Sequence, residues 1–457
     1  MDPQLLFEKM LTVYAGVGKT GKPQKHEHTT LAGVALSFED KGETSDRAVF
    51  VVLATGTKCL PEVARIRGGF AVHDSHAEVL ARRTLVRWLM DEIFAMHMGK
   101  PSKVFEKGAG GLINLRQGVK FHLVVSAAPC GDCAVFAGSN PDGSGVDGHG
   151  EFVGDSGRCL GSWCELSDQT QGGAYKECKA VPVKRLRTGA KVVQSPSVLP
   201  RQESVERASQ RVAAVRRKPG KGLPTSSTSC SDKILRWMHL GFQGCLLRSL
   251  LERPLYFSSL FAACASEESL RRGVWDRQPA TDLDPPIISA ISVQKEILDE
   301  FGLRSTNERV VGSGSCMSWW GRSSHLWKPT SRYPSSSDAE KVSSEIPKAS
   351  KEFREALIGK SGYKAGCLSK PGAPAGPQFH SRISRSRIRT HFVDLVALFP
   401  NSEVYSRIFA GGSCEKHGDI GHEEFKRLVC PTYVNAWNAL RGRPDSMFRM
   451  WIHKREK

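Results

Sequence analysis

Two short apolar runs with a long amphipathic stretch between them constrain the fold more than any other feature of this sequence. The runs at 48–53 and 120–126 are rich in β-branched residues and bounded by turn-forming residues, which predicts two buried strands. Between them, residues 76–97 carry apolar side chains at spacings of three and four, with Asp74 and Ser75 ahead as candidate caps. This pattern predicts a helix. Strands that alternate with helices favour a layered α/β architecture.

The rest of the chain suggests one large unit with insertions. A second amphipathic stretch follows Cys230 and predicts another helix. Residues 140–228 and 312–377 are rich in Gly, Ser and Pro, and we interpret them as flexible insertions. The expected organisation is one domain over 30–457, with a segment 1–29 that packs on this domain or leads into it.

The charge balance favours a polyanionic partner. Lys and Arg number 65 against 47 Asp and Glu, a formal net charge of +18, which suits nucleic acid or an inositol phosphate. The chain is 40% apolar, enough to bury a core and to argue against wholesale disorder. Residues 1–11 lack the pattern of a secretory signal, and no apolar run approaches the ~18 residues of a membrane span. We therefore expect an intracellular protein, in the nucleus or the cytoplasm, with no membrane partner and no evident obligate protein partner.

Three motifs contain most of the residues that could bind a metal or act in catalysis. They are HDSHAEVLARR at 73–83, APCGDC at 128–133 and SCSDKILRW at 229–237. A His-x-Glu followed by Pro-Cys-x-x-Cys, each at the predicted start of a helix, is typical of zinc nucleobase deaminases. In such a site, His76 and two cysteines would hold zinc and leave one position open for water. Glu78 would move protons at that water without binding the metal.

The choice of cysteine ligands stays open at this level. Cys130 and Cys230 are both expected at helix starts, where unpaired N–H groups and the positive end of the helix dipole lower a thiol pKa. By local spacing alone, however, Cys133 competes with Cys230, because it completes Pro-Cys-x-x-Cys. A structural zinc site with four protein ligands is a further alternative, and such a site needs no free carboxylate.

Longer matches around these motifs resemble the adenosine-to-inosine deaminases that act on tRNA and on double-stranded RNA. Besides the three motifs, the matching segments are ATGTKCLPE at 54–62, RTGAK at 187–191, GFQG at 241–244, YVNAW at 433–437 and WIHK at 451–454. The resemblance implies a cytidine-deaminase-like three-layer α/β/α core with a central mixed sheet, extended by insertions and a C-terminal helical part. It also implies a hydrolase that converts adenosine to inosine in tRNA, next to the anticodon of alanine tRNA.

The resemblance assigns roles to individual residues as well. It implies that His76, Cys130 and Cys230 bind zinc and that Glu78 is catalytic. Thr57 and Lys58 match residues near the substrate nucleotide. It further implies a buried inositol hexakisphosphate, which demands many basic partners. The residues that match this ligand's contacts are Arg82, Arg83, Lys233, Arg236, Arg385 and Lys454. Trp437 stands where the family usually has Lys.

Two other functions remain open from the sequence. A noncatalytic RNA-binding protein could retain the zinc deaminase fold, and a cytidine deaminase would be favoured if Cys133 rather than Cys230 held the metal. The environment of Glu78 distinguishes a deaminase from a protein that only binds RNA. A deaminase needs a free carboxylate beside an open zinc position.

Overall fold

The computed structural model describes most of the 457-residue chain. The described residues are 1–39, 48–65, 67–135, 191–193, 212–220, 223–278, 281–306, 308–309, 311–321, 354–409 and 420–451. Among them, no helix is both long and apolar enough to cross a membrane.

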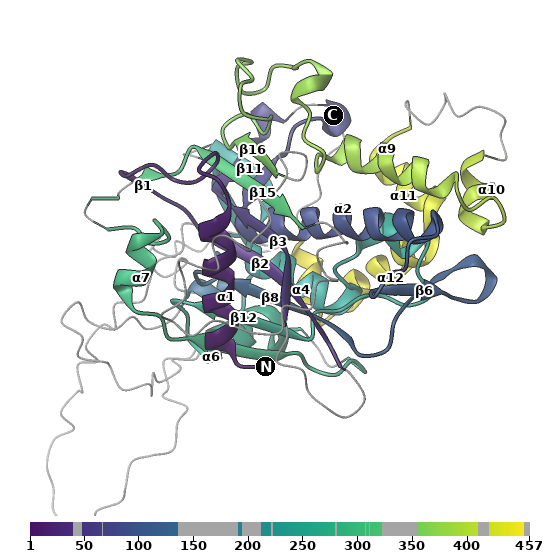
Figure 1. The fold of residues 1–457 in the computed structure, drawn as a ribbon, viewed down its shortest axis with the longest axis horizontal. Helices are drawn as coiled ribbons and strands as arrows, with labels where there is room; N and C mark the ends of the chain where they lie inside the picture. Colours follow the sequence, from purple (N-terminus) through teal and green to yellow (C-terminus); the bar gives the residue numbers. More distant parts are fainter. Residues whose placement is uncertain are drawn as a thin grey trace, which may run out of the picture.

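A seven-stranded mixed sheet forms the centre of the fold (Figure 1), in the strand order β13-β12-β8-β2-β3-β15-β16. Its strands are β2 (Leu31–Phe38), β3 (Val49–Thr55), β8 (Val119–Val125), β12 (Ser259–Ala263), β13 (Ile287–Ile291), β15 (Ser315–Trp320) and β16 (Arg354–Ile358). β12 pairs in parallel with β13 and β8, and the other neighbours are antiparallel. The strands predicted at 48–53 and 120–126 are confirmed as β3 and β8.

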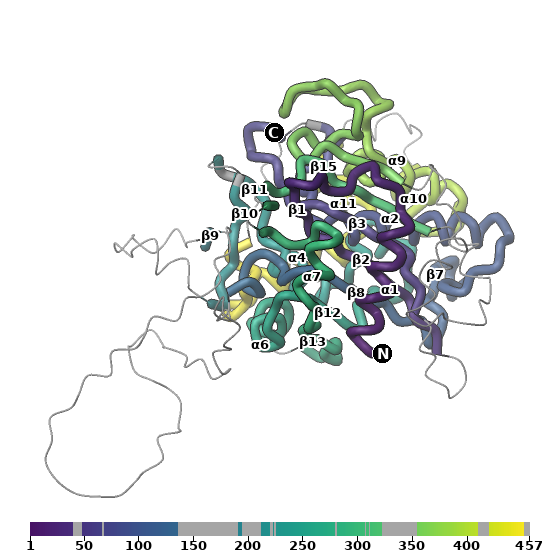
Figure 2. The backbone as a smooth tube through the Cα atoms, turned by 60° about the vertical axis from the view of Figure 1, so that its left-hand side comes forward, coloured from purple at the N-terminus to yellow at the C-terminus, as the bar shows by residue number. Residues whose placement is uncertain are grey.

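Helices cover both faces of this sheet. α2 (Ala77–His97) and α4 (Cys230–Leu240) lie on one face, and α1 (Pro3–Gly16) and α7 (Lys295–Glu300) lie on the other (Figures 1 and 2). Alternate residues of β2 serve the two cores, since successive side chains of a strand point to opposite faces. Val34 packs in the core on the α2 side, whereas Ala35 packs in the core on the α1 side. The predicted three-layer α/β/α arrangement with a mixed sheet is confirmed.

The predicted helix at 76–97 is confirmed as α2, but its predicted caps are wrong. Asp74 and Ser75 belong to β5 (Asp74–His76), which pairs with β4 (Thr57–Cys59). The N-cap residue of α2 is His76, whose side chain makes no capping hydrogen bond. Pairing with β4 therefore keeps the chain extended up to the residue where the helix begins.

A group of C-terminal helices extends the core beside the second half of α2, in green to yellow in Figure 1. The remaining helices are α5 (Gly244–Arg248), α6 (Glu267–Arg271), α9 (Arg385–Val396), α10 (Glu403–Phe409), α11 (His422–Val429) and α12 (Pro431–Gly442). Short helical turns are η1 (Glu62–Ala64), η2 (Arg67–Gly69), η3 (Ala109–Gly111), η4 (Asp132–Ala134), η5 (Arg272–Asp276), η9 (Pro377–Phe379) and η11 (Met447–Met450). The predicted C-terminal helical part is thus present.

Parts of both ranges that we interpret as insertions form defined strands. The remaining strands are β1 (Glu27–His28), β6 (Phe105–Lys107), β7 (Ile113–Leu115), β9 (Lys191–Val192), β10 (Arg216–Gly220), β11 (Leu223–Thr228) and β14 (Val311–Gly312). β10 and β11 pair with each other inside the first range, and β15 and β16 pair with each other inside the second. Residues 136–190, 194–211 and 322–353 lie outside the described residues, so the flexibility of the insertions stays a prediction.

Candidate active site

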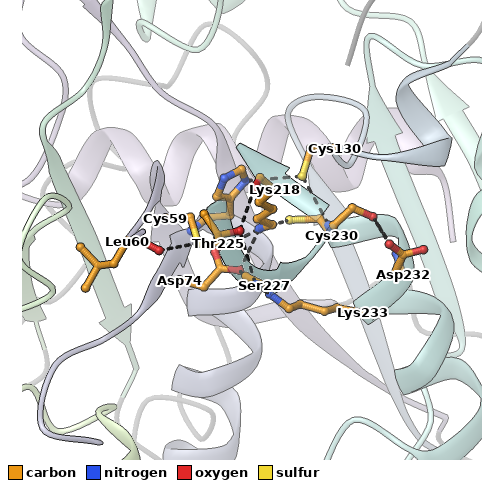
Figure 3. A network of polar contacts seen from close by, with 12 residues as sticks. Cys59, Leu60, Asp74, Cys130, Lys218, Thr225, Ser227, Cys230, Asp232 and Lys233 are labelled. Atoms are coloured by element: carbon orange, nitrogen blue, oxygen red, sulfur yellow. Dashed lines mark hydrogen bonds and ion pairs between the residues drawn. The ribbon is translucent and has the colours of Figure 1, made fainter. Parts of the chain in front are cut away.

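Three side chains that can bind a metal ion meet where α2 begins. His76 precedes α2, Cys130 follows β8, and Cys230 is the first residue of α4. Their ligand atoms all lie within 4.8 Å of one another, and Cys130 Sγ is 3.8 Å from His76 Nδ1. Figure 3 shows the two cysteines of this cluster side by side. Zinc binds nitrogen and sulfur at about 2.0–2.3 Å. Ligand atoms at neighbouring corners of its tetrahedron are therefore separated by a distance close to that between Cys130 Sγ and His76 Nδ1. The cluster fits three corners of a zinc site.

Glu78 supplies a buried carboxyl group beside this cluster. It lies in the first turn of α2, two residues after His76, and is only 3% exposed. Its Oε2 atom is buried and has no hydrogen-bond partner among the described residues. Burial raises the pKa of the Glu78 carboxyl. Within the described chain the ligand group has three members rather than four, which argues against the closed structural site.

The structure separates Cys133 from the metal cluster. Its thiol is fully buried and lies 3.9 Å from the carbonyl oxygen of Leu270. Burial raises the pKa of the Cys133 thiol to about 12, as expected for a cysteine of the core. Cys230 therefore completes the cluster, and the alternative based on local spacing is not supported.

The expectation that a helix starts at Cys130 is wrong. Only the single turn η4 follows, and Gly131 has a φ of 110°, in the region that favours glycine. A Cβ at Gly131 would lie 2.2 Å from Ser229 Oγ, so the chain must turn here close to the start of α4. In place of a helix N-terminus of its own, the Cys130 thiol accepts a hydrogen bond from the Cys230 N–H at 3.4 Å. Hydrogen bonding from Cys230, with the nearby charges of Lys218 and His76, holds the pKa of the Cys130 thiol well below its usual value.

Lys218 is a functional candidate that sequence reasoning missed. It lies on β10, within a basic run that resembles a surface linker, yet its side chain is 0% exposed. Its Nζ donates to Cys230 Sγ at 3.0 Å and to Asp74 Oδ1 at 3.0 Å (Figure 3). The charge of Lys218 favours the thiolate form of Cys230, the form that binds metal. Burial and the neighbouring Cys130 nevertheless raise the pKa of the Cys230 thiol well above its usual value, so the lowered pKa expected there is not found. No local motif distinguishes such a lysine from an exposed one.

Asp74 connects Lys218 to the first turn of α4. It accepts a hydrogen bond from Ser227 Oγ at 2.7 Å and forms an ion pair with Lys233. Burial alone would raise the pKa of the Asp74 carboxyl, but Lys218 and Lys233 together hold it well below its usual range. Lys233, which we expect to contact an inositol phosphate, is therefore also a partner of this buried carboxylate.

One of the two predicted substrate residues, Thr57, lies beside the metal cluster, and the other, Lys58, is its neighbour on β4. In the β4–β5 pair, Thr57 stands directly opposite His76, so both side chains lie on one side of this ribbon. Thr57 Oγ1 is buried and has no hydrogen-bond partner among the described residues. Lys58 follows on the same strand, and its Nζ would lie 3.0 Å from a Cβ built on Gly312. Their role in binding substrate stays a prediction.

A model of the adenosine-deaminase (editase) domain matches residues 52–455. The chain belongs to this family. Its relatives include proteins named tRNA-specific adenosine deaminase 1. The Drosophila melanogaster protein is 31% identical over 60% of this chain and 58% of its own length, and the Homo sapiens protein is 31% identical over 57% and 65%. The Mus musculus protein is 24% identical over 95% and 94%. The chain thus spans roughly three fifths of the first two relatives, and the editase match includes all three motifs.

Four arginines form what we call the basic cluster of this editase domain: Arg82, Arg83, Arg236 and Arg385. Arg82 donates to the Phe242 carbonyl at 2.6 Å, and Arg83 donates to the Ile383 carbonyl at 2.7 Å. Burial lowers the pKa of Arg82 to about 10 and that of Arg83 to about 9, and repulsion from other members of the cluster adds to both shifts. The four predicted arginines thus lie near one another, whereas Lys454 lies outside the described residues.

Aromatic residues of the editase domain surround one member of the basic cluster. Arg236 donates to Tyr433 Oη at 3.2 Å, and its guanidinium lies 4.3 Å from the centre of the Trp437 ring. A second ring, Trp451, lies 5.4 Å from the same guanidinium. Trp437, at the position where the family usually has Lys, therefore contributes a cation–π contact to Arg236 instead of a further charge.

Proposed function

We propose that this protein is a zinc-dependent hydrolase that deaminates adenosine to inosine in tRNA. The proposed target is the adenosine next to the anticodon of alanine tRNA. One observation above all supports the reaction: the three-ligand cluster of His76, Cys130 and Cys230 lies beside the buried carboxyl of Glu78. The names of the relatives support the tRNA substrate. The motif resemblance supports alanine tRNA. An intracellular location, in the nucleus or the cytoplasm, belongs to the same proposal.

The residues of the chain divide the chemistry between them. A bound zinc ion would supply an activated water at neutral pH. The target adenosine must first leave its base stack to reach such a site. Glu78 would then accept a proton from the attacking water and return it to the departing ammonia, while Thr57 and Lys58 hold the nucleotide. The balanced reaction is adenosine plus water to inosine plus ammonia.

Transcribed alanine tRNA is the substrate that tests this function. We expect the purified protein to produce inosine beside the anticodon, read as guanosine on sequencing, and to leave cytidines unchanged. Conversion of cytidine would support the cytidine deaminase instead. If zinc is bound but no inosine forms on alanine tRNA or on pooled tRNA, the noncatalytic RNA-binding protein becomes the better explanation.

We further propose that inositol hexakisphosphate occupies the basic cluster. Clustered, half-buried arginines repel one another, and a polyphosphate would offset this repulsion with charge-assisted hydrogen bonds. We expect about one inositol hexakisphosphate per chain in extracts of acid-denatured protein analysed by mass spectrometry. Arg83→Gln should reduce this occupancy, whereas Arg87→Gln, a control one helical turn away, should not. Active protein without any bound inositol phosphate would contradict the proposal.

A further inference from the structure

Two arginines, Arg277 buried and Arg272 half-buried, hold the chain segments that present the two cysteines of the metal cluster. Arg272 begins η5, a single turn of π-helix that follows α6, and Arg277 comes directly after this turn. Arg272 Nε lies 2.9 Å from Asp132 Oδ2, and Arg277 Nη2 lies 2.7 Å from Asp232 Oδ1. Asp132 is two residues after Cys130, and Asp232 is two residues after Cys230. One arginine thus holds the loop of Cys130 and the other holds the first turn of α4, each through the aspartate two residues after the cysteine.

Additional hydrogen bonds make both attachments rigid. Arg272 Nη2 donates to the carbonyl oxygens of Asp132 at 3.0 Å and Val135 at 2.7 Å, so it holds the loop by main chain and side chain together. Asp232 also accepts from Ser229 Oγ at 2.6 Å and from the Arg216 N–H at 3.0 Å. Both aspartates are at most 1% exposed. A carboxylate buried to this degree is strongly destabilising without its partner, which ties each loop to its arginine.

η5 also approaches the first cysteine loop too closely for any side chain at Gly273. A Cβ built there would lie 2.4 Å from Cys133 Sγ and 2.8 Å from Cys133 N. The Cys133 N–H donates to Ser231 Oγ at 3.0 Å, and Ser269 Oγ on α6 donates to the Cys133 carbonyl at 2.9 Å. The loop of Cys130, the start of α4 and η5 therefore form one packed unit. Turns of π-helix are rare and occur frequently at functional sites.

From this geometry we propose that Arg272 and Arg277 are positioning residues that set the separation of Cys130 and Cys230 and so preform the zinc site. The inference rests on the proposed zinc centre and assigns it two residues from outside its motifs. The two arginines contact Asp132 and Asp232 rather than the ligand side chains themselves, so each acts through the aspartate that it holds. Partners that orient metal ligands typically contribute about 10- to 100-fold to metal affinity.

Zinc affinity and cobalt spectra of the full chain test this role directly. We expect Arg277→Gln and Arg272→Gln each to weaken zinc binding by roughly 10- to 100-fold in competition with a chromogenic chelator. The Co²⁺-substituted variants should also show altered absorption bands of tetrahedral cobalt. Arg277→Lys, which keeps the charge, should recover part of the affinity. Arg271→Gln is the matched control, because Arg271 is adjacent but pairs with Asp276 at the surface, and it should bind zinc as the unmutated protein does.

The outcomes separate this inference from the function on which it rests. If the unmutated protein binds no zinc, the proposed function fails. If it binds zinc and both glutamine variants match it in affinity and in cobalt spectrum, the positioning role is overturned while the proposed function stands. If circular dichroism shows that the glutamine variants do not fold, Gly273→Ala decides. This variant keeps both arginine side chains but forces η5, the element that places them, away from Cys133. Unchanged zinc affinity in a folded Gly273→Ala protein would overturn the inference.

Discussion

Glu78→Ala is expected to lower the rate of adenosine deamination by roughly 10²- to 10⁴-fold, because general acid–base catalysis contributes about this much. Glu78 is the buried carboxyl beside the three-ligand cluster, and its Oε2 has no hydrogen-bond partner among the described residues. It is not a member of the ligand group, so zinc content should stay at the level of the unmutated protein. Single-turnover formation of inosine in alanine tRNA, with zinc measured by mass spectrometry, checks both expectations.

Two further variants sharpen the test of Glu78. Glu78→Gln keeps the size of the side chain and should be as inactive as Glu78→Ala, since an amide cannot accept and return the proton. Asp91→Asn removes a carboxylate on the same helix, where it pairs with Arg87, and should leave the rate nearly unchanged. An active Glu78→Gln protein, or one that loses its zinc, would contradict the proposed role.

Cys230→Ala is expected to abolish both zinc binding and deamination, whereas Cys133→Ala should keep both. Three protein ligands are the minimum of a catalytic zinc site, so loss of one removes the metal under chelator challenge. Cys133, by contrast, is a buried core thiol near Leu270, and its truncation should cost only stability. Zinc per chain after dialysis against a chelator, beside the melting temperature, distinguishes the two effects.

The reverse pattern would change the interpretation of the protein. Zinc lost in Cys133→Ala at an unchanged melting temperature, and kept in Cys230→Ala, would favour the ligand spacing of a cytidine deaminase. Assaying both variants on cytidine as well as on adenosine makes that outcome visible.

Features that depend on local sequence were predictable, and features that depend on distant pairing were not. α2 was predictable because the apolar residues on its buried face recur at spacings of three and four. β3 and β8 were predictable because each is a short apolar run that is buried in the core. The loop at Cys130 was misread as a helix start, since the tight approach of Gly131 to Ser229 arises from packing and not from helix propensity.

The supporting residues of the site show the same limit. Lys218 reads as part of an exposed basic run until β10 places it between Asp74 and Cys230. Arg272 and Arg277 carry no local sign of the aspartates that they meet, more than 40 residues away along the chain. The ligands themselves could be recognised because zinc requires particular residue types, whereas charges that fix ligands can come from any element that folds nearby.

The two arginines also hold the two ends of a long stretch of chain that lies far from them in the sequence. Arg272 binds the Val135 carbonyl and Arg277 binds the Ala214 carbonyl, so both ends of the intervening stretch are anchored to the same short element. The entropy of closing a loop grows slowly with its length, by about 0.6 kcal/mol per doubling. A change in the number of residues between these anchors, outside β9, therefore adds little closure entropy and leaves both anchored ends where they are. The length of that stretch is thus only weakly coupled to the separation of the two cysteines, which the anchors on η5 maintain.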